Sequence, residues 1–89
     1  MKNVKSMEKE LKAFANRRRL AIVQYLKRHK RVPVGKIAKS IRASFKATSK
    51  QLIILKNAGI VEVRQDGQQM LYSIARKHTP VVWRLIALL

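Results

Sequence analysis

The sequence predicts a mainly α-helical domain with a small β-hairpin. Apolar residues recur at helical spacing in about five segments of the chain. Asp66-Gly67 separates two short stretches in which apolar and polar residues alternate, as they do in two strands joined by a tight turn. Residues 36–74 therefore predict helix, turn, helix and hairpin in that order. This is the plan of a winged helix-turn-helix, here with about five helices and a two-stranded wing.

The composition fits one domain, residues 1–89, that meets an anionic partner. The chain is 47% hydrophobic, and 21 Lys and Arg against 4 Asp and Glu give a formal net charge of +17. Nucleic acid is the first candidate partner and a membrane surface the second. The sequence has no run that would span a bilayer, no signal-peptide pattern and no cysteine. We therefore expect a cytoplasmic, nucleoid-associated protein without disulfides or thiolate metal sites.

The first two helices are predicted from caps and apolar stripes. Ser6 is the expected cap of the first helix, and its stripe is Met7, Leu11 and Phe14. Asn16 is the expected cap of a second helix over residues 17–29.

The third and fourth helices follow Pro33. Val34, Ile37, Ala38 and Ile41 form one apolar face of the third helix, and Arg42-Ala43 is the turn. Ser44 is expected to cap a fourth helix that runs to Ala58, with Gly59 just past its end.

The hairpin and a last helix complete the prediction. Strands are expected over residues 60–65 and 68–74. A turn at Asp66-Gly67 pairs Gln65 with Gln68, Val63 with Met70 and Val61 with Tyr72, and it places both apolar pairs on one face. Thr79-Pro80 opens the last helix, residues 80–89, because proline suits the first turn. Its stripe is Val82, Leu85, Ile86 and Leu89.

The helix over residues 45–58 is the candidate DNA reader. Thr48, Leu52 and Leu55 share its inward face, whereas the opposite face carries two lysines and short hydroxyl side chains. An ordinary solvated face is the alternative, but the helix-turn-helix plan and the net charge favour DNA. Phe45 is expected to pack inward, although it could touch a thymine methyl. The predicted DNA-binding residues, including phosphate contacts and the wing, are Lys36, Lys39, Ser44, Lys46, Ser49, Lys50, Arg64 and Gln68.

The role of three consecutive arginines is left open, and the two histidines do not predict a metal site. Arg17, Arg18 and Arg19 crowd a helix start, where they either contact phosphate or, for Arg19, pack locally. His29 and His78 are expected to be surface residues, because no His, Asp or Glu cluster has metal-ligand spacing. No catalytic residue, metal site or cofactor is predicted, so the chain is not expected to be an enzyme.

Several segments together resemble the ArsR-type winged-helix repressors. They are Leu11-Lys-Ala-Phe-Ala-Asn16, Arg19-Leu-Ala-Ile-Val23, Val34-Gly-Lys-Ile-Ala38, Ser44 through Leu52, Leu55-Lys-Asn-Ala-Gly-Ile-Val61, and Leu71-Tyr-Ser-Ile74 with Asp66-Gly67. The resemblance implies a homodimeric repressor that reads double-stranded DNA with the helix over residues 45–58. It also implies a dimer interface on the first and last helices, about residues 6–15 and 80–89. The residues implied there are Met7, Leu11, Phe14, Val82, Leu85, Ile86 and Leu89, whose alternative role is packing within one chain.

The chain departs from the family pattern in three places. Pro33 and Gly35 stand where many members carry a metal-sensing cysteine pair, and the histidine-carboxylate set of the last helix is missing. Arg42 stands where the turn usually has glycine, so a reshaped turn is expected. Lys50-Gln51 replaces a common histidine pair. We therefore expect a metal-independent regulator of unknown effector. The alternative is a basic architectural chromatin protein or an RNA- or ribosome-associated one.

Overall fold

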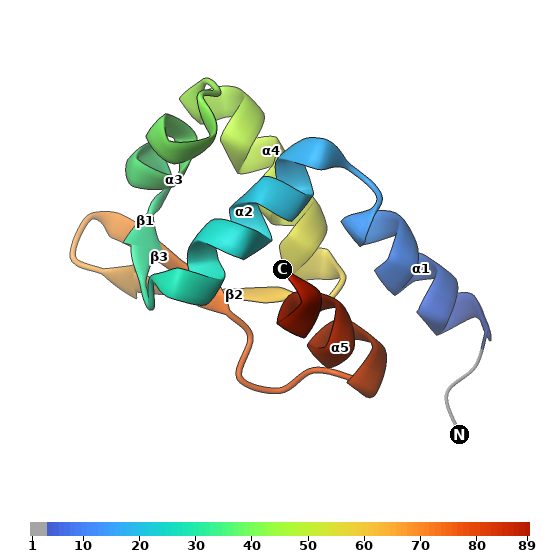
Figure 1. The fold of residues 1–89 in the computed structure, drawn as a ribbon. Helices are drawn as coiled ribbons and strands as arrows, with labels where there is room; N and C mark the ends of the chain where they lie inside the picture. The colour runs from blue at the N-terminus through green and yellow to red at the C-terminus, as the bar shows by residue number, and fades with distance from the viewer. Residues whose placement is uncertain (1–3) are drawn as a thin grey trace.

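The structure is a computed structural model that describes residues 4–89, and it confirms the predicted fold class (Figure 1). The elements in chain order are α1 (Val4–Phe14), α2 (Arg17–Arg28), β1 (Val32–Pro33), α3 (Val34–Ile41), α4 (Phe45–Asn57), β2 (Val61–Asp66), β3 (Gln69–Ile74) and α5 (Pro80–Leu88).

Two of the three predicted helix caps are confirmed, and Thr79, which was predicted only to open the last helix, also caps it. The side chain of Asn16 accepts a hydrogen bond from the Arg19 backbone N–H at 3.1 Å. Ser44 accepts one from Ala47 at 3.0 Å, and Thr79 accepts one from Val82 at 3.4 Å. The prediction for Ser6 is wrong, because α1 already begins at Val4 and Ser6 lies inside its first turn.

The presence of Arg42 in the turn between α3 and α4 predicted a reshaped turn. The structure contradicts this, because the turn keeps its left-handed residue. Arg42 itself takes the left-handed conformation, with φ 56° and ψ 48°. Its N–H and that of Ala43 donate to carbonyls of the last turn of α3, the latter to Ala38 at 3.0 Å. These bonds cap the carbonyl end of α3 and offset a strain of about 1 kcal/mol.

The two-residue turn of the hairpin lies one residue later in the chain than predicted. The loop is Gly67-Gln68, so Val63 faces Tyr72 and Gln65 faces Met70. Gly67 has φ +64°, which suits the first loop position of a type II′ turn. Each partner therefore shifts by two residues, and a shift of two keeps every side chain on its predicted face.

The wing gains a third strand that was not predicted. β1 pairs with β3 through Val32–Tyr72 and Pro33–Leu71, giving the strand order β1-β3-β2. Two residues are too few for an alternating pattern. Proline also argues against a strand, although it is tolerated at a sheet edge.

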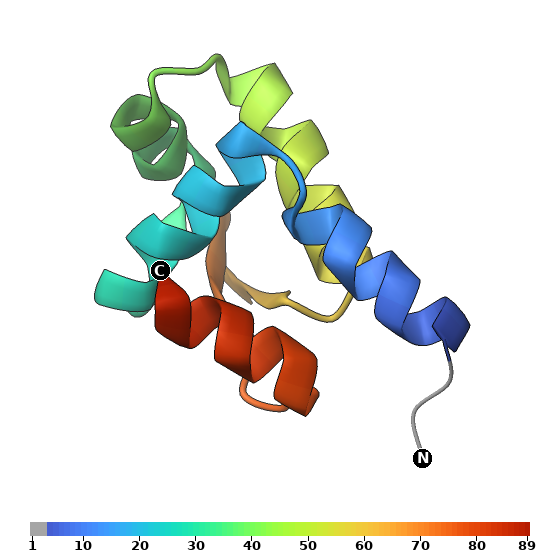
Figure 2. The ribbon, with the colours of Figure 1, turned by 45° about the vertical axis from the view of Figure 1, so that its right-hand side comes forward.

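One hydrophobic core joins all the helices and the base of the wing. Ile22, Ile37, Leu52, Leu55 and Ile60 are fully buried. α5 lies against α2 and α1, as Figure 2 shows. Its carbonyl end is held by α2: Lys27 donates to the Ala87 carbonyl at 3.1 Å, and Gln24 donates to that of Leu89 at 3.3 Å.

The terminal apolar stripes, which are the predicted dimer interface, divide between this core and the surface. Phe14, Val82 and Ile86 are 5%, 1% and 8% exposed and pack inside the chain. They offer a partner little area. Met7 and Leu11 are exposed, and Leu85 and Leu89 are partly buried.

Candidate nucleic-acid interface

The fourth helix presents one face to the core and the other to solvent. Thr48, Leu52 and Leu55 are buried, as predicted. The Thr48 hydroxyl donates to the Ser44 carbonyl at 2.8 Å, which satisfies a polar group that is 0% exposed. Packing of these side chains fixes the rotation of α4 about its own axis.

The outward face of the first half of α4 carries the predicted readers. Lys46 and Lys50 are exposed and Ser49 is partly exposed. Ser44 is exposed too. Its hydroxyl oxygen accepts the capping hydrogen bond from the Ala47 N–H, and the same hydroxyl can also donate a hydrogen bond to another group. Two ammonium groups and two hydroxyls on one helical face suit base edges and phosphates in a major groove.

Phe45 is 63% exposed, so the expectation that it packs inward is wrong. Its helical position matches the buried face, but the first turn of α4 lies at the edge of the domain (Figure 1). No core side chain covers it there. The aromatic ring is thus part of the exposed surface beside Lys46.

The third helix adds cations beside the reader. Lys36 and Lys39 are exposed, as is Arg42 in the turn. Arg42 was considered only as a turn residue from the sequence. Its side chain is exposed two residues before the cap of α4. The charge of Arg42 in the sequence does not by itself predict that its side chain lies beside α4.

The wing tip is polar and solvent-exposed. Arg64 and Gln68 are exposed, and the Gln65 amide donates to the Gly67 carbonyl at 3.2 Å, which stiffens the loop. Asp66 is the one acidic side chain at the tip. Arg64 therefore has the freedom to reach a groove or a phosphate.

The three consecutive arginines at the start of α2 have different environments. Arg17 and Arg18 are exposed, whereas Arg19 packs locally. Its guanidinium donates to the Ala13 carbonyl at 2.6 Å, to the Lys12 carbonyl at 3.1 Å and to the Gln51 side-chain oxygen at 2.8 Å. Arg19 therefore links the end of α1 to the middle of α4, a contact between residues 32 positions apart.

The histidines do not form a metal site within residues 4–89. No group of three His, Cys, Asp or Glu side chains there lies close enough to bind a metal ion. His29 stacks on Tyr25, with ring centroids 4.2 Å apart. His78 is partly exposed, and its Nδ1 atom is buried without a hydrogen-bond partner in that range. In the same range no helix is long and apolar enough to cross a membrane.

Solved structures of similar sequence are winged-helix regulators. One is the homodimeric winged helix-turn-helix DNA-binding domain of Mb0332 from Mycobacterium bovis. It is 34% identical with a TM-score of 0.83, and the match covers 96% of this chain and 75% of that one. HlyU from Vibrio cholerae N16961 is 31% identical with a TM-score of 0.83, covering 98% and 90%.

A third similar structure is the transcriptional repressor PagR of Bacillus anthracis. It is 26% identical with a TM-score of 0.79, covering 96% and 93% of the two chains. A search of functionally curated proteins gives no match. The profile of the bacterial regulatory proteins of the arsR family matches residues 16–63. The fold and this match are those of transcriptional regulators and not of enzymes. The chain belongs to the ArsR family and is a winged-helix, DNA-binding transcriptional regulator.

Proposed function

We propose that this regulator is a metal-independent homodimeric repressor that reads DNA with the first half of α4. The outward face of that half carries the proposal: it combines exposed ammonium groups, hydroxyls and an exposed aromatic ring on a rigid, core-packed helix. In this assignment Ser44, Lys46, Ser49 and Lys50 face the major groove. Lys36 and Lys39 contact phosphates, and Arg64 and Gln68 act from the wing.

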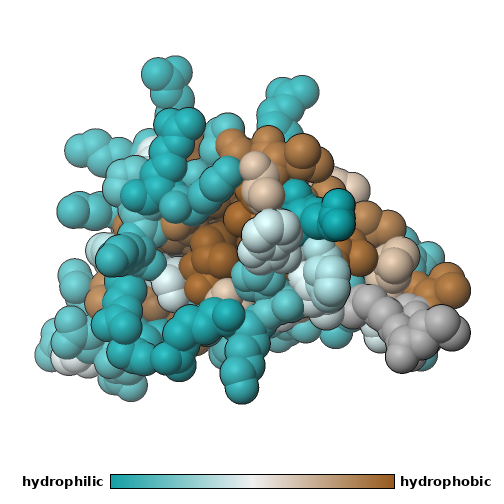
Figure 3. All heavy atoms as spheres, turned by 60° about the horizontal axis from the view of Figure 1, so that its bottom comes forward, coloured by the Kyte–Doolittle hydropathy of each residue, from teal (hydrophilic) through white to brown (hydrophobic). Residues whose placement is uncertain are grey.

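The homodimer part of the proposal is supported by apolar side chains that the monomer leaves exposed. In α1 they are Val4 at 84%, Met7 and Leu11, and in α5 they are Trp83 at 60% and Leu88 at 82%. Viewed from the side of α5, apolar patches interrupt the hydrophilic surface (Figure 3). A second copy would cover them. The similar domain of Mb0332 is homodimeric, which supports a homodimer here.

Oligomeric state in solution tests the dimer. Leu11→Glu places a charge on the exposed stripe of α1 without removing a core contact, since Leu11 is 46% exposed. Light scattering coupled to size exclusion should report a dimer for the parent chain and a monomer for this variant. A parent chain that stays monomeric at high concentration contradicts the proposal.

Repression and metal independence rest on different support. The similar protein PagR is a repressor. The sequence has no cysteine and four carboxylates in all, which leaves few donors for a sensing metal. Operator affinity unchanged by chelators and by added Zn²⁺, together with reduced reporter expression from a bound promoter, would support both parts. A large effect of Zn²⁺ on operator affinity would contradict the second part.

A salt titration on duplex DNA tests the reading surface. Log affinity should fall linearly with log salt, with a slope of about −0.9 for each phosphate neutralised. Lys46→Ala with Lys50→Ala should weaken binding and reduce the slope by about one for each lysine that contacts phosphate. Lys56→Ala is the matched control, because Lys56 is exposed on the last turn of the same helix. Unchanged DNA affinity in the double variant would show that another surface of the protein binds DNA.

A second candidate function is supported by cations outside the reading surface. Four cationic residues lie in the five positions from Lys27 to Arg31, and all five residues are exposed. Lys30 and Arg31 line a hollow at the base of the wing together with Arg76. Such a spread favours low-specificity architectural binding, or binding to structured RNA, with the same fold. Genome-wide occupancy separates the alternatives: a few sharp palindromic sites indicate a regulator, whereas broad coverage or competition by RNA indicates the second function.

A further inference from the structure

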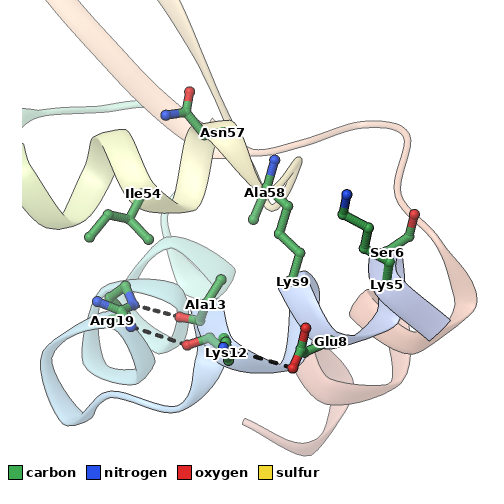
Figure 4. A pocket seen from close by; sticks show the side chains of 10 residues that line it. All are labelled: Lys5, Ser6, Glu8, Lys9, Lys12, Ala13, Arg19, Ile54, Asn57 and Ala58. Atoms are coloured by element: carbon green, nitrogen blue, oxygen red, sulfur yellow. Dashed lines mark hydrogen bonds and ion pairs between the residues drawn. The ribbon is translucent and has the colours of Figure 1, made fainter.

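A hollow lies between α1 and the second half of α4, on the side of α4 away from its reading end (Figure 4). Its volume is about 580 Å³. Sites for small organic ligands occupy about 300–1,000 Å³. The groove is therefore large enough for a small molecule.

The floor of this groove is aliphatic. Ile54 from α4 points toward Ala13 of α1, and Ala58 continues the floor at the end of α4 (Figure 4). Ile54 is 41% exposed although it neighbours the fully buried Leu55. A hydrocarbon chain laid on this floor would remove that apolar area from water.

The rim of the groove is cationic. Lys5, Lys9 and Lys12 project from α1, and Arg19 closes one end. Glu8 is the single carboxylate among the lining residues, and it pairs with Lys12 at 3.8 Å. No carboxylate within residues 4–89 pairs with Lys5 or Lys9. Two ammonium groups thus stand over an apolar floor without an ion-pair partner in the described residues.

We propose that the groove between α1 and α4 binds an amphipathic anion, a carboxylate carrying a hydrocarbon tail. The carboxylate accepts hydrogen bonds from the ammonium groups of Lys5 and Lys9, and the tail lies on Ile54 and Ala58. A nucleic-acid backbone would satisfy the lysines but would leave the aliphatic floor in water. The combination of an apolar floor and a cationic rim therefore favours the amphiphile.

The groove adjoins the surface of the proposed dimer but differs from it in its charged residues. The apolar stripe of α1 lines a second hollow, formed by Val4, Met7, Glu8, Leu11, Lys12 and Ala15. Glu8 and Lys12 line both hollows, whereas Lys5 and Lys9 line only the groove. The two lysines proposed to bind the anion therefore lie outside the hollow that the stripe forms.

The same groove adjoins the contact between α1 and the reader. Arg19 lines it and donates both to the Ala13 carbonyl and to Gln51 of α4. A ligand here lies against both helices, so its binding should shift the position of α4 relative to α1. This regulatory consequence, unlike the binding itself, rests on the proposed DNA-reading function.

Direct binding to the full chain, without DNA, tests the site. Octanoate is the probe, octanol supplies the tail without the charge, and butyrate supplies the charge with a shorter tail. Calorimetry should show octanoate saturating at one per chain, with both comparison compounds weaker. Amide chemical shifts should move at Ala13, Ile54 and Ala58.

Two pairs of variants locate the contacts. Lys5→Ala with Lys9→Ala should weaken octanoate about tenfold, the loss of two exposed ion pairs, and should leave octanol unchanged. The control with the same loss of charge is Lys30→Ala with Lys77→Ala. Ile54→Ser should weaken octanoate, whereas Ile53→Ser, the neighbouring exposed isoleucine, should not. Alanine favours helices, so the lysine variants keep the fold.

Three results would overturn the proposal. They are equal affinity for octanol and octanoate, shifts confined to Met7 and Leu11, and tighter binding of a glutamate-rich peptide, which would assign the groove to an acidic protein segment. A final measurement adds octanoate to the DNA complex. Octanoate binding without any change in DNA affinity would keep the site and reject only its regulatory role.

Discussion

Arg19→Ala is the substitution whose effect can be worked out most fully from the structure. The guanidinium makes three hydrogen bonds, to the carbonyls of Lys12 and Ala13 and to the side chain of Gln51. Each is worth about 0.5–1.5 kcal/mol net. The Lys12 carbonyl keeps a second donor, the Ala15 N–H at 3.1 Å, so its loss is partly compensated. We expect the free energy of unfolding to fall by about 2 kcal/mol.

Urea unfolding followed by circular dichroism measures this loss. In a domain of this size about 2 kcal/mol corresponds to a fall in melting temperature of about 8–16 °C. Protein concentration must be held constant, because dimerisation would contribute to stability. Arg18→Ala is the matched control, because Arg18 is exposed and the substitution removes the same charge. It should change the free energy of unfolding by less than about 0.5 kcal/mol.

Two further variants show whether the geometry or the charge of Arg19 matters. Arg19→Lys keeps the charge but lacks the forked donors, so it should lose most of the stability that Arg19→Ala loses. Combining Arg19→Ala with Gln51→Ala should cost less than the sum of the two single losses. Equal urea midpoints for Arg19→Ala and Arg18→Ala would refute the assigned contacts.

Three other substitutions test local backbone and surface assignments. Arg42→Gly should raise the free energy of unfolding by about 0.5–1 kcal/mol, because glycine relieves the left-handed strain at φ 56°; a loss of stability in urea would contradict this. Gly67→Ala should cost about 1 kcal/mol and speed hydrogen exchange in β2 and β3, since φ is +64° there with open space around the added methyl. Gly35→Ala, in the helix α3 and with equally open space, is its control and should stabilise slightly. Phe45→Ala should change unfolding by less than about 0.5 kcal/mol but alter the preference for a thymine-containing site in a binding selection; a large loss of stability would return Phe45 to the core.

Local signals predicted the elements because their causes are local. Asn16, Ser44 and Thr79 cap helices through bonds to residues three positions on, which a sequence window contains. The apolar spacing of α3 and α4 likewise predicted their buried faces. The hairpin faces were right although the turn was misplaced, because a shift of two residues preserves alternation.

The sequence by itself determined the winged helix-turn-helix, the excess of positive charge and the outward lysines of the reader helix. Tertiary structure alone decided which apolar side chains of the terminal helices are buried in the core: Phe14 and Val82 are buried, whereas Leu88 is exposed. It also decided that Phe45 is exposed and that Arg19 joins α1 to α4. The physical reason is that periodicity specifies which face of a helix is apolar. Whether another element covers that face depends on contacts between residues far apart in the chain.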